Sequence, residues 1–293
     1  MKKVSYFLSA ALVGALVACG GGSKELACPN ESVPYVVKTT ETVVPADSIN
    51  KIPEYTILNK TQVDLSAFPK DADGAIILFC GKSLYGWRGY NMDTVPARWS
   101  IDSCALKIKG SGTGEAQAND GGDIIFAHKF KNFELTFDWK VSKGANSGVF
   151  ILAQEVKGEP IYISSPEYQI LDNVNHADAS QGENGNRQSA SLYDMIPAKP
   201  QNSKPFGEWN TGGITVYQGS VFYKQNGKTV VEYHLWTPKW TEMLQASKFS
   251  QEKWPLAFKL LNNCGGDNHE GYIGFQDHGN DVWFRNIKIK ITD

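Results

Sequence analysis

After residue 74 the chain alternates apolar and polar positions with the two-residue period of β-strands. The clearest case is residues 133–141, where aromatic and aliphatic side chains take one set of alternate positions and polar side chains the other. Only residues 239–247 suggest a helical turn. The other predicted strands are short and cover residues 75–80, 99–108 (two strands with a turn near Asp102-Ser103), 123–126, 147–154, 167–171, 214–217, 221–225, 230–235, 256–261, 272–276 and 282–291. About a dozen strands with almost no helix predict an all-β sandwich of two antiparallel sheets, of jelly-roll type if the sheets are large and curved.

The strand predicted at residues 167–171 differs from the others in its polar face. Glu167, Gln169 and Leu171 share one face, and Tyr168 and Ile170 share the other. The strand then runs into a polar loop that contains Asp172, Asn173, Asn175, His176 and Asp178. This segment is either a solvated edge strand followed by an ordinary polar loop, or one wall of a binding site.

Two further segments place polar side chains beside predicted strands. They supply Gln276 and His278, which share a face at the end of the strand at 272–276, and Glu208, Trp209 and Asn210, which precede the strand at 214–217. A single histidine at a strand end is more often a structural residue than a catalytic one. The three segments together predict a polar site on the concave face of the sandwich.

Composition and charge narrow the functional classes. The 293 residues carry a formal net charge of −2, with Lys and Arg scattered along the chain. No basic patch therefore indicates a nucleic-acid partner. The eight tryptophans are typical of sugar-binding surfaces, which use indole rings as stacking platforms, although core packing is their commoner use.

The N-terminus resembles a bacterial lipoprotein signal. Lys2 and Lys3 precede an apolar run at residues 6–17 that is too short to span a bilayer, and the run ends at Ala18-Cys19. We therefore predict that residues 1–18 are a signal peptide and that acylated Cys19 attaches the exported protein to a bacterial membrane, at its periplasmic face or at the cell surface. An ordinary cleaved signal or an uncleaved anchor is the alternative.

The rest of the chain divides at about residue 74. Residues 19–73 have few large apolar residues in any regular pattern and contain several prolines, which predicts a tether and linker. Residues 33–44 could dock part of this linker as an edge strand. Residues 74–293 form the predicted folded domain.

Export changes how the remaining cysteines are interpreted. Cys28, Cys80, Cys104 and Cys264 show no CxxC spacing and no histidine at ligand spacing, which argues against a zinc site. Disulfides are allowed in an exported protein. Cys80 and Cys104 lie in neighbouring predicted strands and are the first candidates for a pair, with buried free thiols as the alternative.

Seven short motifs give the domain a family resemblance. Between residues 75 and 290 they are Leu78-Phe79-Cys80-Gly81-Lys82-Ser83-Leu84 with Gly86-Trp87, Asn146-Ser147-Gly148-Val149-Phe150, Glu167-Tyr168-Gln169-Ile170-Leu171-Asp172, Ser191-Leu192-Tyr193, Glu208-Trp209-Asn210, Asn226-Gly227, and Gly274-Phe275-Gln276-Asp277-His278-Gly279 with Phe284-Arg285-Asn286-Ile287. In order and spacing they are similar to the family of 3-keto-disaccharide hydrolases and 3-keto-glucoside 1,2-lyases. Cys80 and Ser191 depart from the family pattern, which commonly has Asn or Asp and Gly or Ala there. The resemblance implies a concanavalin A-like jelly roll and a carbohydrate substrate.

The polar strand carries too few carboxylates for the usual sandwich glycosidase. Retaining enzymes place two carboxyl groups about 5–5.5 Å apart, whereas this strand offers Glu167 beside Gln169. The family's substrate suggests another route, because a ketone at C3 acidifies the C2 proton and allows β-elimination of the C1 oxygen. We expect Glu167 or His278 to take that proton, with water then adding to the product.

The remaining candidate residues have supporting roles. Gln169, Asn210 or Gln276 would donate to the C3 oxygen as charge develops there, and Trp209 would stack on the sugar ring. Asn146 and Glu208 complete the expected binding residues. Asp172 and Asp277 would orient the histidine or hold a divalent cation with His278, or else simply cap loops.

No cofactor is required by this scheme, and a divalent cation is optional. A separate oxidoreductase would have to make the 3-keto group. The competing hypothesis is a non-catalytic, lectin-like surface lipoprotein, because jelly rolls host carbohydrate-binding proteins as readily as enzymes. The clustering of titratable groups beside carboxamides favours the enzyme.

Overall fold

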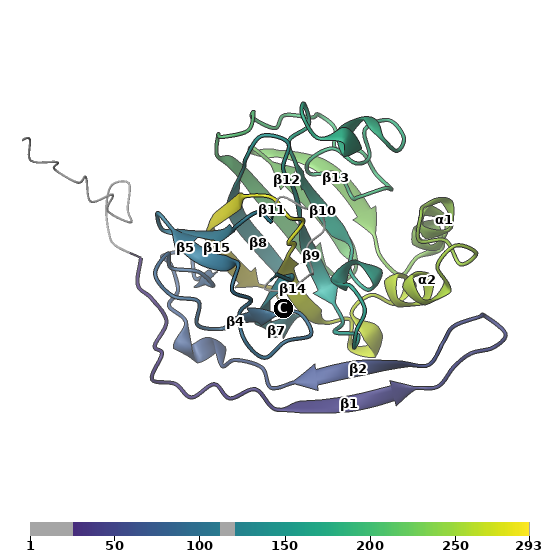
Figure 1. Ribbon diagram of the computed structural model, residues 1–293, viewed down its shortest axis with the longest axis horizontal. Coiled ribbons are helices and arrows are strands. Elements are labelled where there is room, and N and C mark those ends of the chain that lie inside the picture. Colours follow the sequence, from purple (N-terminus) through teal and green to yellow (C-terminus); the bar gives the residue numbers. More distant parts are fainter. Residues whose placement is uncertain (1–25, 112–120, 293) are drawn as a thin grey trace, which may run out of the picture.

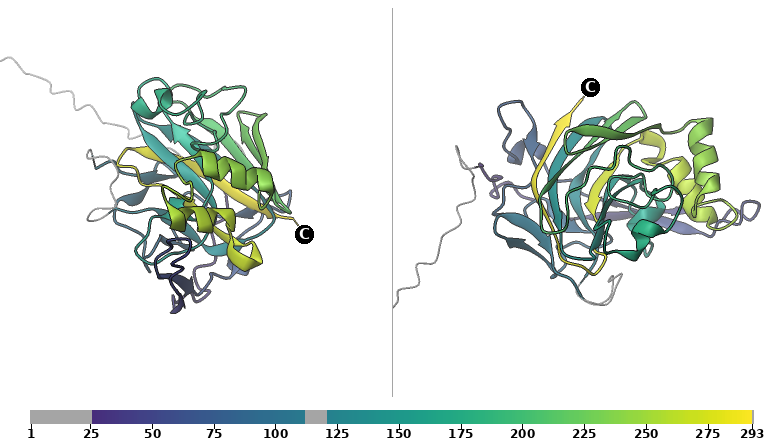
Figure 2. Two further views of the ribbon diagram at one scale, coloured as in Figure 1. Left: turned by 90° about the vertical axis from the view of Figure 1, so that its right-hand side faces the viewer. Right: turned by 90° about the horizontal axis from the view of Figure 1, so that it is seen from above.

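Two antiparallel sheets packed face to face form the body of the protein (Figures 1 and 2). A computed structural model describes residues 26–111 and 121–292. The smaller sheet has the strand order β10 (Glu167–Leu171), β9 (Asn146–Ala153), β14 (Gly271–Phe275), β7 (Ile124–Phe130) and β4 (Trp87–Gly89). The larger has the order β13 (Lys228–His234), β12 (Ser220–Gln225), β11 (Asn210–Tyr217), β8 (Phe133–Val141), β15 (Val282–Ile291), β6 (Ala105–Ile108) and β5 (Trp99–Asp102), with β3 (Ile76–Ile77) pairing β15. The predicted all-β, concanavalin A-like jelly roll is confirmed.

The main core lies between the two sheets. Along β8, alternate residues from Phe133 to Val141 are buried, as their period predicts. The ring of Phe137 lies 5.5 Å from that of Tyr168 in β10 and 6.2 Å from that of Phe275 in β14, so these side chains meet between the sheets. Because neighbouring residues of a strand point to opposite faces, Glu167 and Gln169 must lie on the outer face of the smaller sheet.

That outer face is covered rather than solvated. A second apolar cluster lies on it, formed by Tyr90, Ile125, Phe150, Ala153, Ile161 and Tyr272, all buried. The short helix η2 (Ile161–Ile163) contributes Ile161 to this cover. All five residues of β10 are buried, so the strand is not a solvated edge.

Two helices lie beside the sandwich (Figure 1). The first, α1 (Pro238–Ala246), fits the helical turn predicted at residues 239–247. The second, α2 (Pro255–Asn262), occupies residues 256–261, so the strand predicted there is wrong. Pro255 begins the helix, and the buried Leu256 and Leu260 are four residues apart, which is helical spacing. The remaining short helices are η1 (Leu65–Ala67), η3 (Ala177–Ser180) and η4 (Gly266–Asn268).

Part of the linker forms a hairpin that docks on the sandwich. Its strands β1 (Thr39–Val44) and β2 (Tyr55–Lys60) are antiparallel, and the Leu58 amide donates to the Glu155 carbonyl at 2.8 Å. A disulfide joins Cys28 to Cys80, so the pairing predicted between Cys80 and Cys104 is wrong. Cys264 is a buried free thiol.

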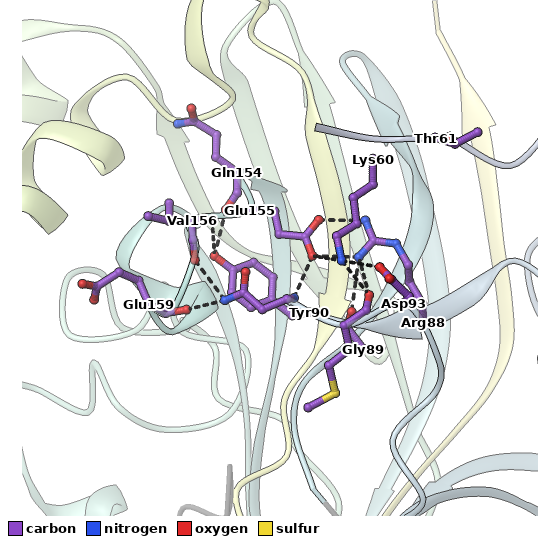
Figure 3. Close-up of polar contacts among 12 residues, drawn as sticks. Lys60, Thr61, Arg88, Gly89, Tyr90, Asp93, Gln154, Glu155, Val156 and Glu159 are labelled. Atoms are coloured by element: carbon purple, nitrogen blue, oxygen red, sulfur yellow. Dashed lines mark hydrogen bonds and ion pairs between the residues drawn. The ribbon is translucent and has the colours of Figure 1, made fainter. Parts of the chain in front are cut away.

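A buried cluster of charged side chains fixes the docked hairpin (Figure 3). The Arg88 guanidinium donates to both carboxylate oxygens of Glu155, at 2.7 and 2.8 Å. Lys60 of β2 reaches the same carboxylate at 3.7 Å and Asp93 at 2.7 Å. The side chains of Lys60, Arg88 and Glu155 are at most 4% exposed.

The predicted signal peptide and Cys19 lie outside the described residues. Among the helices that are described, none has the length and apolar character needed to cross a membrane.

Candidate functional site

A small polar recess, with a cavity volume of about 30 Å³, opens on the outer face of the smaller sheet, at its β10 edge. We call it the first recess; its lining residues are Asn146, Tyr162, Glu167, Gln169, Tyr193, Lys248, Gln276 and His278. Of these, Asn146, Glu167, Gln169, Gln276 and His278 are residues that the sequence predicted for a site. Three segments far apart in the sequence therefore meet at one place.

Strand pairing explains this convergence. In the β9–β10 pair, Gln169 lies opposite Gly148 and Leu171 lies opposite Asn146, so residues of both strands share the outer face. The Gln276 amide donates to the Gly148 carbonyl at 2.9 Å, which brings the end of β14 to the same face. His278 follows two residues later and points to the same side as Gln276.

The carboxyl group of Glu167 occupies space that a glycine leaves open. A Cβ atom at Gly148 would overlap Glu167 Oε1, so any other residue at 148 would displace the carboxyl group. Glu167 is only 8% exposed. Burial raises its pKa to about 8, although the nearby Lys248 and His278 act in the opposite direction.

Three carboxamide groups in the first recess have buried polar atoms without a hydrogen-bond partner among the described residues: Asn146 Oδ1, Gln169 Nε2 and Gln276 Oε1. Gln169 Oε1 accepts from the Ile170 amide at 3.1 Å, which leaves Nε2 as the group that can donate. Buried polar atoms without partners are rare in folded proteins. These atoms are therefore suited to bind the hydroxyl and carbonyl groups of a ligand.

Sequence reasoning missed Tyr162, Tyr193 and Lys248. Lys248 Nζ lies 4.5 Å from the ring centre of Tyr193, 5.4 Å from that of Tyr162 and 5.0 Å from that of Phe249. Such cation–π contacts hold the amine at the wall of the recess. These residues follow no strand period, and the only signal was the Ser191-Leu192-Tyr193 motif.

Tyr193 is held by both its backbone and its hydroxyl group. Its amide donates to the Glu167 carbonyl at 3.1 Å, so the segment before it runs along the free edge of β10. Its hydroxyl donates to Asp178 at 3.0 Å, and Arg187 joins Asp178 to Asp194. Burial, with smaller effects of Glu167 and Asp178, raises the pKa of Tyr193, so the phenol stays protonated.

Asp172 and Asp277 do not line the first recess and bind backbone amides instead. Asp172 accepts from the amides of Gly144 and Val174 at 2.8 and 3.1 Å. Partial burial opposes ionisation of Asp172, but its hydrogen bonds outweigh this and lower its pKa. Asp277 accepts from the Gly122 amide at 3.0 Å and pairs with Arg98 at 3.3 Å.

The cation site suggested for Asp172, Asp277 and His278 does not form in the described residues. In residues 26–111 and 121–292, no three His, Cys, Asp or Glu side chains gather as a metal-ligand set, so Asp172, Asp277 and His278 do not converge in that way. His278 lies instead beside His176, with ring centres 6.1 Å apart. Burial, together with His278, lowers the pKa of His176.

Glu208, Trp209 and Asn210 lie away from the first recess, at the start of β11 in the larger sheet. Glu208 is exposed. The Arg285 guanidinium lies 3.9 Å from the ring centre of Trp209. Asn210 Oδ1 accepts from the Lys204 amide at 2.7 Å and from Asn226 at 2.8 Å. The structure therefore does not bring these three residues together with Glu167.

Comparison with known proteins gives the site a family context. A family model described as a 3-keto-alpha-glucoside-1,2-lyase-like domain matches residues 74–290. A protein of Bacteroides thetaiotaomicron named 3-keto-disaccharide hydrolase is 57% identical, with 100% of each chain covered.

Solved structures agree in fold. A protein of Parabacteroides distasonis provisionally named a glycosyl hydrolase is 26% identical, with a TM-score of 0.63, over 76% of this chain and 95% of that one. A second such structure from the same organism, also 26% identical, has a TM-score of 0.50 over 70% of this chain and 99% of that one. The resemblance seen in the motifs is confirmed, and the chain belongs to the family of 3-keto-alpha-glucoside-1,2-lyase-like domains.

Proposed function

We propose that this protein is an enzyme that cleaves 3-keto-glycosides by β-elimination, followed by addition of water. One observation carries the proposal: Glu167 is the only carboxylate among the described residues that line the first recess, and it lies among carboxamides with unpartnered polar atoms. The name of the 57% identical relative supports the same class of substrate.

The first step is removal of the C2 proton, which the neighbouring C3 ketone acidifies. Glu167 is the base, because burial makes its carboxylate more basic than an exposed one. As the proton leaves, negative charge moves to the C3 oxygen. Gln169 Nε2 can donate to that oxygen, because its amide is buried in the recess with no other acceptor among the described residues.

In the second step the electron pair forms the C1–C2 double bond and the C1–O bond breaks. The departing alkoxide takes a proton from the recess wall, where Lys248 and His278 both lie. Water then adds at C1 of the unsaturated ketone, which gives net hydrolysis. A double displacement would need a second carboxylate about 5–5.5 Å away, and Asp172 is bound to backbone amides outside the recess lining.

Location and supply of substrate are part of the proposal. Residues 1–19 support export and a lipid anchor at Cys19. Removing hydride from C3 is a redox step that elimination does not perform, so a separate oxidoreductase must supply the ketone.

Incubation with a 3-keto-disaccharide tests the function. We expect release of a free sugar and transient ultraviolet absorbance from an unsaturated ketone, because elimination precedes hydration. The control is the same disaccharide without the ketone, which we expect to stay intact. Binding without turnover would instead indicate a carbohydrate-binding protein, and equal cleavage of both sugars would contradict elimination.

Gly148→Ala tests the position of the base. A methyl group there would push the Glu167 carboxyl group out of place, and we expect kcat/KM to fall by about ten- to a hundredfold. The control is Gly213→Ala, where an added Cβ would meet its nearest neighbour at 3.4 Å, an ordinary contact. If both variants keep the activity of the original protein, Glu167 is not the base in its present position.

A further inference from the structure

One arginine links the segments that form a wall of the first recess. Arg187 lies in the loop after β10 and lines a second recess, which Lys248 separates from the first. The Nε atom of Arg187 donates to Asp194 at 2.7 Å, and its Nη1 atom donates to Asp178 at 3.0 Å. The side chains of the arginine and its two partners are at most 21% exposed, so both ion pairs are largely shielded from solvent. None of the roles assigned above uses Arg187.

Each of the two carboxylates also holds one residue of the wall. Asp178 accepts from the Tyr193 hydroxyl at 3.0 Å, through the oxygen that the arginine leaves free. Asp194 accepts from the Lys248 amide at 2.9 Å, again through its other oxygen. The guanidinium group therefore connects Tyr193 with Lys248, whose amine lies 4.5 Å from the centre of the tyrosine ring.

The backbone at Asp194 depends on these contacts. Its φ angle is 62°, in the left-handed region that is uncommon for a residue other than glycine. Such a conformation persists only where neighbouring contacts fix it. Here the Asp194 amide donates to the Asn186 carbonyl at 3.0 Å, and Arg187 holds the side chain. Loss of the arginine would therefore release the backbone next to Tyr193.

The amine of Lys248 connects this arrangement with the chemistry. Burial is the main cause of the raised pKa of Glu167, and the charged groups that modify this pKa are Lys248 and His278, which lower it, and Asp123 and Asp178, which raise it. Lys248 has the largest effect of these four. Arg187 holds Lys248 in place and neutralises Asp178, so both of its contacts favour ionisation of Glu167.

We propose that Arg187 is a positioning residue for the reaction, which acts through its two carboxylate partners on Lys248 and Tyr193. It lies outside the first recess and holds the Lys248 amine in the recess that contains Glu167. A planar guanidinium group suits this role, because it can bind two carboxylates at once in a fixed geometry. The inference rests on the proposed function, in which Glu167 removes the C2 proton.

Arg187→Ala tests this role with a 3-keto-disaccharide as substrate. We expect kcat to fall about thirty- to a hundredfold while KM changes less than about threefold, because the amine moves out of place and the carboxamides that bind the sugar stay. The rising part of the kcat/KM profile should also move to higher pH, because Glu167 loses a nearby positive charge and Asp178 is no longer neutralised. Arg187→Lys should restore only part of kcat, because one ammonium group cannot bridge both carboxylates in the same way.

Rescue by guanidinium ion gives a second measurement. Arg187 is 21% exposed and lines the second recess, so its removal leaves a space that solvent can reach. Millimolar guanidinium chloride should raise kcat of Arg187→Ala severalfold and leave the original protein unchanged. Sodium chloride at the same concentration is the control for ionic strength.

A double-mutant cycle shows whether Arg187 acts through Lys248. In a Lys248→Met background, Arg187→Ala should lower kcat by less than about threefold, because the group that it positions is already gone. The matched control is Arg285→Ala, which removes an arginine paired with Asp138 at 3.3 Å on the larger sheet and should leave kcat and the pH profile unchanged.

Thermal unfolding of every variant checks folding, and if Arg187→Ala is unfolded the comparison is made with Arg187→Lys. A folded variant that keeps the kcat and the pH profile of the original protein would overturn the proposal. A loss of kcat that is the same with and without Lys248 would overturn it too. Cleavage by the original protein is measured separately from the variants. If the original protein does not cleave the 3-keto-disaccharide, the proposed function is wrong and the role of Arg187 is wrong with it.

Discussion

Glu167→Gln should lower kcat on a 3-keto-glycoside by about a thousandfold while KM changes little, because a neutral amide cannot accept the C2 proton. The amide has nearly the same shape as the carboxyl group and fits the space above Gly148. Binding of the sugar should therefore survive. Steady-state kinetics on a 3-keto-disaccharide measure both constants.

The pH dependence gives an independent check on the same residue. With a pKa of about 8, Glu167 becomes a competent base only as the pH rises toward that value, so kcat/KM should increase up to about pH 8 and then level off. If Glu167→Gln keeps full activity and His278→Asn loses it, then His278 is the base. If both variants keep full activity, neither residue abstracts the proton.

The same substitution should stabilise the fold at high pH. An unfolded glutamate has a pKa of about 4.3, and the folded value is about 8. Between these values the folded state keeps a proton that the unfolded state has released, so stability falls as the pH rises, by about 1.4 kcal/mol for each pH unit. Glu167→Gln removes this loss. The variant should match the original protein near pH 4.5 and unfold at a higher temperature near pH 8.5.

Burying a catalytic carboxylate lowers the stability of the fold at high pH, so the Glu167→Gln variant should gain stability and lose activity. Denaturant titration at the two pH values measures the difference directly. A variant that is less stable than the original protein at pH 8.5 would show that ionised Glu167 is stabilised in the folded state, and the burial argument would then be wrong.

The parts of this structure that follow a strand period could be predicted from sequence. Residues 133–141 form β8 with the predicted alternation. The polar face of β10 also follows from alternation, because once Tyr168 faces the core, Glu167 and Gln169 must face outward. That is why Glu167 and Gln169, and likewise Gln276 and His278, were found without a structure, whereas Asn146 was named only within a motif of the family resemblance.

Residues in loops and at helix ends could not be found in this way. Tyr193 reaches the recess because its segment packs on the edge of β10, and Lys248 because its amide is bound by Asp194 of that same segment. No local sequence pattern records either contact. Trp209 is the reverse case: its place in a motif suggested sugar stacking, whereas its ring lies against the Arg285 guanidinium and does not line the first recess. The apolar run at residues 256–261 was too short to distinguish a strand from a buried helix, and Pro255 was the overlooked signal.

Glu155→Gln should lower the free energy of unfolding by about 3–5 kcal/mol, which is the largest loss of stability we expect from a single substitution in this protein. The carboxylate of Glu155 accepts two hydrogen bonds from Arg88, lies 3.7 Å from Lys60 and accepts from the Asn91 amide at 2.7 Å (Figure 3). An amide would leave the buried Arg88 without its counter-charge. Denaturant unfolding followed by tryptophan fluorescence measures the loss.

Two further variants test whether the loss of stability comes from leaving a buried charge unpaired. Asp93 is 62% exposed, so Asp93→Asn should cost less than about 1 kcal/mol although it also removes a partner of Lys60. Replacing both partners, as Arg88→Met with Glu155→Leu, should recover much of the stability that Glu155→Gln loses, because no unpaired buried charge remains. If Glu155→Gln lowered the free energy of unfolding by no more than Asp93→Asn does, water would have to reach Arg88 in solution. The hairpin would then be held by the Cys28–Cys80 disulfide and by strand contacts rather than by this cluster.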